Sequence, residues 1–175
     1  RLSRLAPSAA DPVSPMSRPP RRPVARASTD SAREAVDPQR LRDRVSRWFA
    51  ANSRDLPWRD PSCGPWGVFL SEVMSQQTPV ARVAPVWAEW MQRWPTPEHL
   101  AQASPADVVR AWQRLGYPRR ALRLREAAVA MVARHEGQVP SAEADLRALP
   151  GVGEYTAAAV AAFGFGLRSV VVDTN

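Results

Sequence analysis

The spacing of apolar residues along the chain predicts a protein built from helices. Residues 38–51 place Leu41, Val45, Trp48 and Phe49 on one face and their arginines mostly outside it. Apolar residues that recur three or four positions apart are typical of an amphipathic helix. The same spacing returns in most of the segments that follow, so the chain is expected to be all-α.

Helix start signals recur at Asp37-Pro38, Thr78-Pro79, Thr96-Pro97 and Ser104-Pro105, where a capping residue precedes a proline. Helices are expected over residues 38–51, around Glu72, from 79 to about 94, after Pro97, from Pro105 to near Gly116, over 118–135, within 141–149 and over 153–163. The segment "RSVVVD" near the end is the one stretch that reads as extended.

Glu72 is a carboxylate inside the apolar run Val68-Phe69-Leu70-Ser71-Glu72-Val73-Met74. A buried carboxylate is costly unless it is paired or protonated. Desolvation raises the pKa of such a group, and Glu72 is therefore expected to carry a proton that it can deliver as a general acid. A glutamate at a helix edge, bonded to the backbone or to an arginine, is the structural alternative.

The stretch "LPGVGEYTAAAVAAF", residues 149–163, predicts two helices joined by a tight Gly-Val-Gly turn. Gly151 and Gly153 permit positive φ and close backbone approach, with Val152 as an apolar anchor. The amide groups of the turn and of the next helix's first turn can bind a phosphate. This pattern is typical of a helix-hairpin-helix element, and a plain helix–helix turn is the alternative.

Composition adds a polyanionic partner to this picture. The net charge is +7, and all 24 basic residues are arginine. Such a balance favours nucleic acid, although a basic proteome gives the same bias. The missing lysine excludes a Schiff base on a side chain of these residues, and Cys63 as the single cysteine excludes an internal disulfide or a multi-cysteine metal site within them.

Residues 1–37 are rich in Pro, Arg, Ser and Ala, lack aromatic residues and are expected to be disordered. No apolar stretch is long enough to span a membrane, and no signal-peptide core precedes the folded part. A cytosolic location is therefore expected, with no membrane partner.

Several motifs in order resemble the MutY-type adenine DNA glycosylases of the helix-hairpin-helix DNA glycosylase superfamily. They are "LPWR" (56–59), "SEVMSQQTPV" (71–80), "RWPTPEHLA" (93–101), "WQRLGYPRRALRL" (112–124), "LPGVGEYTA" (149–157) and "VVDTN" (171–175). The resemblance implies that Glu72 is the general acid, and that Asp173 stabilises the positive charge on the sugar, where a plain helix cap is the alternative. Tyr155 and Asn175 match residues that support this step.

The resemblance also assigns the DNA contacts. Tyr155 stands where the bifunctional branch of the superfamily has a Schiff-base lysine, which implies hydrolysis of the glycosidic bond without strand nicking. A flipped base leaves a gap that other side chains must fill. The residues implied in DNA or base binding are Trp58, Arg59, Gln76, Gln77, Thr78, Tyr117, Gly151, Val152 and Gly153.

The resemblance implies a helix-hairpin-helix DNA glycosylase fold that is only partly present. Residues 1–37 would be a tail, 38–56 the N-terminal helix of an iron-sulfur domain otherwise missing, and 57–175 a six-helix barrel domain with the hairpin at about 143–163. The cysteines of a 4Fe-4S cluster would lie beyond Asn175, so no metal ligand is expected in these residues. A piece ending at Asn175 is expected to excise little by itself. Ser75 and Pro118 depart from the family pattern of leucine and tyrosine.

The expected partner is double-stranded DNA with a mismatched adenine, bound by a monomer. Adenine opposite 8-oxoguanine or guanine would be the substrate. Two alternatives remain open, namely another monofunctional mismatch glycosylase such as a thymine enzyme for T:G pairs, and a non-catalytic helix-hairpin-helix DNA-binding module.

Overall fold

The computed structural model describes residues 37–171, which form helices joined by turns and irregular segments, with no strand among them. The helices are α1 (Pro38–Asn52), α2 (Gly64–Ser75), α3 (Val80–Arg93), α4 (Pro97–Gln102), α5 (Pro105–Ala111), α6 (Arg119–Arg134), α7 (Glu143–Arg147) and α8 (Glu154–Phe165), with the short 3₁₀ helices η1 (Pro57–Arg59) and η2 (Pro61–Cys63). The all-α prediction is confirmed.

The chain divides into two compact units, residues 1–50 and 51–175. The described part of the first unit is residues 37–50, which comprise Asp37 and most of α1. The Asp37 carboxylate accepts a hydrogen bond from the Gln39 amide at 2.9 Å, as expected of a cap. α1 buries none of its residues, and its apolar face is exposed, with Trp48 64% accessible.

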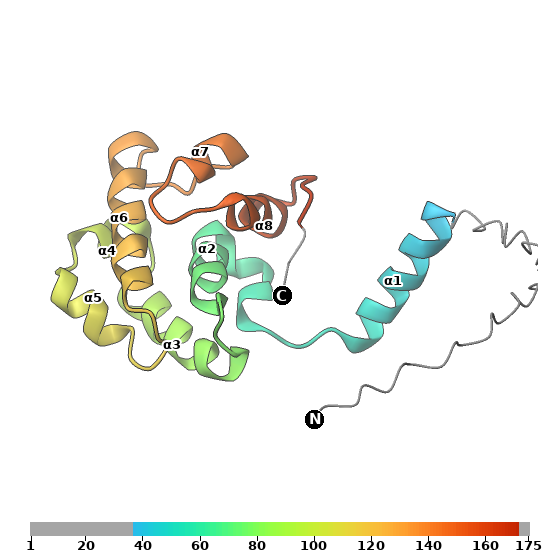
Figure 1. Ribbon diagram of the computed structural model, residues 1–175, viewed down its shortest axis with the longest axis horizontal. Coiled ribbons are helices and arrows are strands. Elements are labelled where there is room, and N and C mark those ends of the chain that lie inside the picture. Colours follow the sequence, from blue (N-terminus) through green and yellow to red (C-terminus); the bar gives the residue numbers. More distant parts are fainter. Residues whose placement is uncertain (1–36, 172–175) are drawn as a thin grey trace, which may run out of the picture. The chain divides into compact units, whose positions relative to one another are not determined.

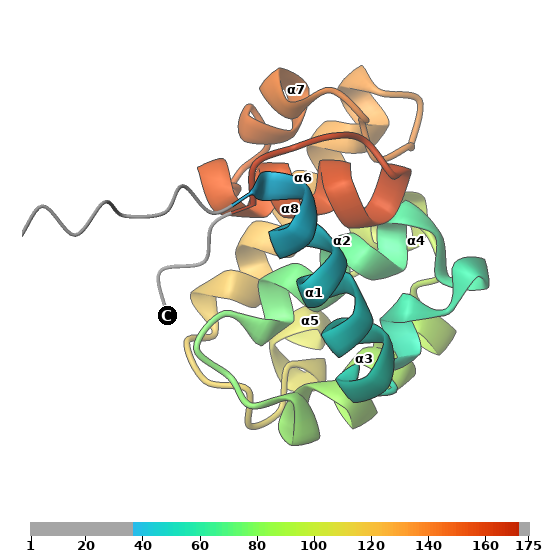
Figure 2. The same ribbon diagram turned by 90° about the vertical axis from the view of Figure 1, so that its right-hand side faces the viewer.

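In the second unit α2 is the central helix. It packs extensively against α8 and also contacts α3 and α6, and α2 and α8 lie side by side in both ribbon views (Figures 1 and 2). Eight of the twelve residues of α2 are buried. A helix that is apolar on most of its surface is typical of the middle of a helical domain.

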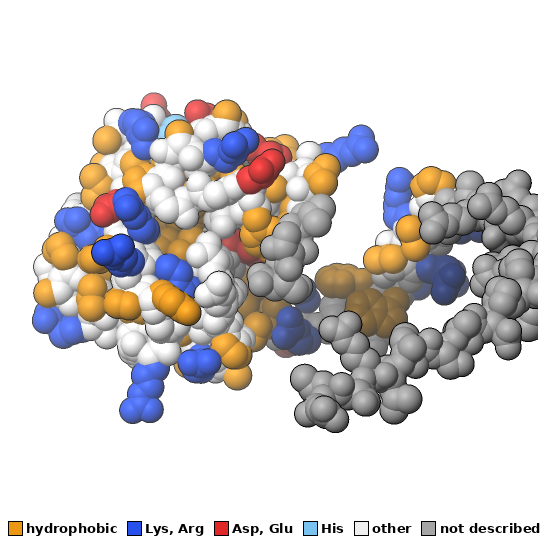
Figure 3. Space-filling model, in the orientation of Figure 1, with side chains coloured by type: hydrophobic (Ala, Val, Ile, Leu, Met, Phe, Trp, Pro, Cys, Tyr) orange, Lys and Arg blue, Asp and Glu red, His pale blue; other side chains and the backbone are white. Residues whose placement is uncertain are grey.

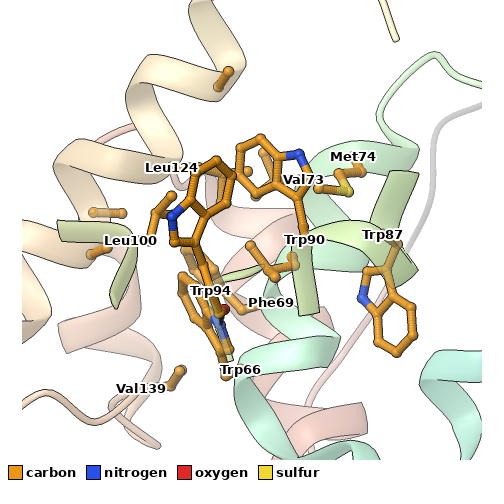
Figure 4. Packing of buried hydrophobic residues seen from close by; sticks show 14 of the residues in the cluster. Trp66, Phe69, Val73, Met74, Trp87, Trp90, Trp94, Leu100, Leu124 and Val139 are labelled. Atoms are coloured by element: carbon orange, nitrogen blue, oxygen red, sulfur yellow. Dashed lines mark hydrogen bonds between the residues drawn. The ribbon is translucent and has the colours of Figure 1, made fainter. Parts of the chain in front are cut away.

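Tryptophan rings fill much of the core around α2 (Figure 4). Trp90 on α3 is 1% exposed and packs edge to face against Trp94 and Trp112, with ring centroids 4.8 and 5.5 Å away. The Trp90 indole N–H donates to the Ala111 carbonyl at 2.9 Å, so its polar atom is satisfied inside the core. With Val83, Val86 and Trp87, Trp90 forms the buried face of α3.

Two expected helix boundaries differ from the structure. The third helix begins at Val80 with Pro79 as its N-cap, because the Thr78 hydroxyl bonds the Gln76 and Leu115 carbonyls and does not cap the helix. α5 ends at Ala111, and turns rather than helix lead to Gly116. Ser104 does accept the expected capping bond from the Asp107 amide. Within residues 37–171, no helix combines the length and hydropathy of a membrane span.

Candidate functional site

An open cleft of about 650 Å³ lies where the end of α2, the turn before α6 and the start of α8 meet. Three segments that are far apart in sequence therefore share one cavity. Its lining residues are Glu72, Ser75, Gln76, Gln77, Tyr117, Arg120, Gly153, Glu154, Tyr155 and Thr156.

Glu72 reaches this cleft from the last turn of α2 and is the one acidic residue of that helix. Its neighbours Ser71, Val73 and Met74 are buried, whereas Glu72 itself is half-buried. The cleft exposes part of the Glu72 side chain, so this carboxyl group is less enclosed than its neighbours on the helix. Its position still gives a carboxyl group with an apolar helix behind it and an accessible cavity in front.

The opposite wall of the cleft is the helix-hairpin-helix element. Gly151 has a φ of 80°, a left-handed conformation that favours glycine, and an added Cβ would lie 2.8 Å from the Arg123 Cβ. Gly153 has a φ of −94°, which any residue can adopt, and it serves as the N-cap of α8. Nothing lies within 4 Å of a Cβ built on Gly153, so its backbone is open to a ligand.

The start of α8 supplies groups suited to an anion. The first amide groups of a helix have no partner within it, and the helix dipole favours negative charge there. α8 has no side-chain cap bond at Gly153, and Glu154 and Tyr155 follow on the cleft wall. The Gln76 amide donates to the Thr156 hydroxyl at 3.2 Å and so links this wall to the end of α2.

Gln77 and Tyr117 lie on the exposed rim of the cleft. Both have a positive φ, 53° and 47°, which is uncommon for residues other than glycine. Tyr117 is 66% exposed. These two side chains are available to a molecule that enters the cleft, and their predicted contact with DNA stays a prediction.

Arg120 is the cleft residue that sequence reasoning missed. Its guanidinium donates to backbone carbonyls on both sides of the cleft floor and lies over the Trp112 ring at 5.1 Å. Burial lowers the pKa of Arg120 from its ordinary value, while Tyr117 acts in the opposite direction. Nothing in the sequence distinguishes this arginine from the other basic residues, because most of its partners are backbone carbonyls.

Other predicted site residues lie outside the cleft lining. The Trp58 ring packs at the edge of the core, 5.8 Å from Trp87, and Arg59 donates to the Arg54 carbonyl at 2.9 Å. Thr78 is buried with its hydroxyl bonded to protein atoms, and Val152 packs against the core as the expected anchor. Their predicted contacts with a base or DNA stay predictions.

Asp173 and Asn175 lie outside the residues that the structure describes. Within residues 37–171 no group of three or more His, Cys, Asp or Glu side chains could bind a metal ion. Cys63 alone cannot supply the four thiolates of an iron-sulfur cluster. The side chains of this chain therefore do not form a cluster site by themselves.

Comparisons with known proteins show a family and several similar proteins. The family model of the "HhH-GPD superfamily base excision DNA repair protein" matches residues 70–175. An adenine DNA glycosylase of Mycobacterium tuberculosis is 54% identical over 128 residues, which cover 73% of this chain and 42% of the relative. The chain thus spans less than half the length of this curated relative.

Two solved structures share the fold. A thermostable thymine-DNA glycosylase has a TM-score of 0.70 at 24% identity, covering 78% of this chain and 65% of that one. Endonuclease III in a non-covalent complex with DNA has a TM-score of 0.67 at 25% identity, covering 78% and 64%. The family model matches more than half of the residues of this chain. The chain therefore belongs to the HhH-GPD superfamily of base excision DNA repair proteins.

Proposed function

We propose that the protein is a monofunctional adenine DNA glycosylase. It would hydrolyse the N-glycosidic bond of adenine mispaired with 8-oxoguanine or guanine in double-stranded DNA. The observation that carries this proposal is the position of Glu72 on the wall of a cleft whose other wall is the start of the hairpin helix α8. The 54% identity to an adenine DNA glycosylase supports the choice of base.

Glu72 would act as the general acid. Adenine leaves poorly as an anion, so a proton delivered to its ring lowers the barrier to breaking the bond. The positive charge that develops on the sugar requires a nearby carboxylate, as in glycoside hydrolysis generally. We assign this second role to Asp173, with Tyr155 and Asn175 as supporting residues.

Hydrolysis without strand nicking follows from the side chains available. A lyase reaction of this superfamily needs an amine that forms a Schiff base. Tyr155 occupies the cleft wall, and residues 1–175 include no lysine. The expected products are free adenine and an intact strand with an abasic site.

DNA would be bound by a monomer through the hairpin and the rim. Gly151 and Gly153 would bring the backbone amides of the turn and of α8 close to a phosphate. Gln77 and Tyr117 would enter the base stack beside the extruded adenine, while Gln76, Thr78, Trp58, Arg59 and Val152 would support the pocket. A cytoplasmic location and a 4Fe-4S cluster are further proposals, and the cluster ligands would have to lie outside residues 1–175.

One observation favours a second candidate. The fold match to a thymine-DNA glycosylase allows the base to be thymine opposite guanine, because the shared helices do not select the base. A non-catalytic DNA-binding module is a weaker alternative, since it has no need for a carboxyl group on the cleft wall.

A duplex panel tests the proposal. The full-length protein is incubated under single-turnover conditions with duplexes that contain A:8-oxoguanine, A:G, T:G or A:T. The account predicts release of adenine from the first two, with strand breaks only after alkali. Release of thymine from T:G alone would support the second candidate, and binding without release from any duplex would support the module.

A further inference from the structure

The Arg120 guanidinium connects two segments of the cleft that are about 40 residues apart in sequence. Nη1 donates to the carbonyls of Val73, Met74 and Gln76, at 3.0, 3.2 and 2.6 Å. These carbonyls belong to the end of α2 and the turn after it. The same side chain also reaches the turn before α6.

Nη2 makes the second set of contacts. It donates to the Thr78 hydroxyl and the Leu115 carbonyl at 3.0 Å each, and to the Gly116 carbonyl at 3.2 Å. The Thr78 hydroxyl itself lies 3.1 Å from the Leu115 carbonyl. One planar group therefore ties the segment that carries Gln77 to the segment that carries Tyr117.

An arginine is required for this geometry. Its two terminal nitrogens point in fixed directions, whereas lysine presents one nitrogen on a flexible stem. The guanidinium also lies over the Trp112 ring at 5.1 Å and the Tyr117 ring at 5.7 Å, which fixes its plane. Its positive charge suits the carbonyl end of α2, where the helix dipole is negative.

The two segments need such support because both contain strained backbone. Gln77 and Tyr117 have left-handed φ values, and Gly116 has a φ of 78°. Conformations of this kind persist in residues other than glycine only when their surroundings fix them. Arg120 bonds the Gln76 and Gly116 carbonyls, which immediately precede the two strained residues.

We propose that Arg120 is a positioning residue that sets the spacing and direction of Gln77 and Tyr117 for extruding the target base. This inference rests on the proposed glycosylase function. Arg120 affects excision through these two side chains. Most of the affinity for DNA comes from contacts between the DNA and the hairpin at the start of α8, which do not depend on Arg120. Loss of its bonds therefore impairs extrusion and excision more than binding.

The test compares Arg120→Lys with Arg125→Lys in the full-length protein. Arg125 is a matched control, because it is a half-buried arginine on the same helix and its Nε donates to the Ala103 carbonyl at 2.6 Å, outside the cleft lining. Three quantities are measured for each variant: the melting temperature, the affinity for undamaged duplex and the single-turnover excision rate. Extrusion is followed by the fluorescence of 2-aminopurine placed opposite 8-oxoguanine, which rises when the base leaves the stack.

Arg120→Lys is expected to slow excision by about tenfold to a hundredfold, as misplaced groups do near reacting atoms. The fluorescence rise should shrink in parallel, and the affinity for undamaged duplex should change by less than about threefold. Arg125→Lys should leave both the rate and the fluorescence unchanged. Wild-type values for Arg120→Lys, or a loss of affinity as large as the loss of rate, would overturn the proposal.

Thr78→Val provides a second, milder variant if Arg120→Lys does not fold. It removes the buried hydroxyl that Nη2 contacts and keeps the shape of the side chain. A smaller loss of fluorescence and rate in the same direction is expected, and an unchanged fluorescence rise would count against the proposal. The fluorescence does not require chemistry, so it tests Arg120 even if the wild-type protein releases no base from the duplex panel.

Discussion

Glu154 places a second carboxyl group on the cleft wall, at the first residue of α8. It is exposed, and it follows directly on the open backbone of Gly153. A carboxylate there is favourable for the helix because of the helix dipole. It is unfavourable for a DNA phosphate that approaches the same amide groups, so folding and binding place opposite demands on this residue.

Glu154→Gln is therefore expected to bind duplex DNA more tightly, by about twofold to fivefold at low salt, because one repulsive charge is removed. The free energy of unfolding should fall by about 0.3–1 kcal/mol, the usual contribution of a charge at a helix end. Fluorescence anisotropy with labelled duplex and urea denaturation measure the two effects. Weaker binding would show that Glu154 makes a favourable contact with DNA.

At the scale of single residues, the sequence identifies those whose chemistry differs from that of their neighbours along the chain. Glu72 was identifiable because it stands alone in an apolar run, and its place on the cleft wall fits that identification. Its degree of burial was not predictable, since the cavity in front of it is formed by residues about 80 positions away. Arg120 escaped notice for a similar reason, because three of its partners are backbone carbonyls at the end of α2, more than 40 positions away.

At the scale of elements, the hairpin shows how two glycines with the same sequence signal differ in role. Gly151 is required by its backbone conformation and by its packing against Arg123. Gly153 has an ordinary φ and open space where a side chain would be. The "PGVG" motif predicted the turn, but only the structure separates the conformational glycine from the one that leaves room for a ligand.

Gly151→Ala should lower the free energy of unfolding by about 1–3 kcal/mol, because alanine is strained at a φ of 80° and its Cβ would clash with Arg123. Gly153→Ala is the matched control, with an expected change within about 0.5 kcal/mol. Denaturant unfolding of both variants measures the difference. Equal stabilities would mean that the turn does not depend on the left-handed conformation.

Most helices were predictable from caps and periodicity, including α1, α6 and α8. The errors fell where a tertiary contact overrode a local signal. Thr78 reads as an N-cap from its Thr-Pro pair, yet its hydroxyl bonds Leu115, and the helix begins at Val80. The sequence shows that such a residue could cap the helix that follows it. It does not show the distant residue whose hydrogen bond replaces the capping bond.

At the scale of the whole molecule, the second unit depends on a core rich in tryptophan. Trp90 lies between Trp94 and Trp112 and uses its indole N–H inside the core. Large aromatic residues bury much apolar area while their polar atoms still need a partner. The cleft is built on this core, since Trp112 also supports the Arg120 guanidinium.

Trp90→Phe is expected to destabilise the second unit by about 2–4 kcal/mol, through lost packing and the lost hydrogen bond to Ala111. Trp48→Phe on α1 is the comparison, because that ring is 64% exposed, and its cost should stay below about 0.5 kcal/mol. Thermal unfolding followed by circular dichroism reports both. If the two substitutions lowered the stability equally, Trp90 would not belong to the main hydrophobic core.

The charge of the molecule suits the proposed DNA partner, which would be bound through many weak contacts. The net charge is +7, and Figure 3 shows arginine side chains scattered over the visible face of the helical body. Affinity for undamaged duplex should therefore fall steeply as salt increases, with each neutralised phosphate adding about 0.9 to the slope of log K against log salt. Binding that does not change with salt would exclude this electrostatic contribution.

The central claim is that the Glu72 carboxyl group delivers a proton to the departing base. The most direct measurement is the single-turnover release of adenine opposite 8-oxoguanine by the full-length Glu72→Gln variant, with the same substitution at exposed Glu89 as a control. The account predicts that Glu72→Gln abolishes release while duplex affinity stays within about threefold, and that Glu89→Gln behaves as wild type. Adenine release by Glu72→Gln at the wild-type rate would contradict it.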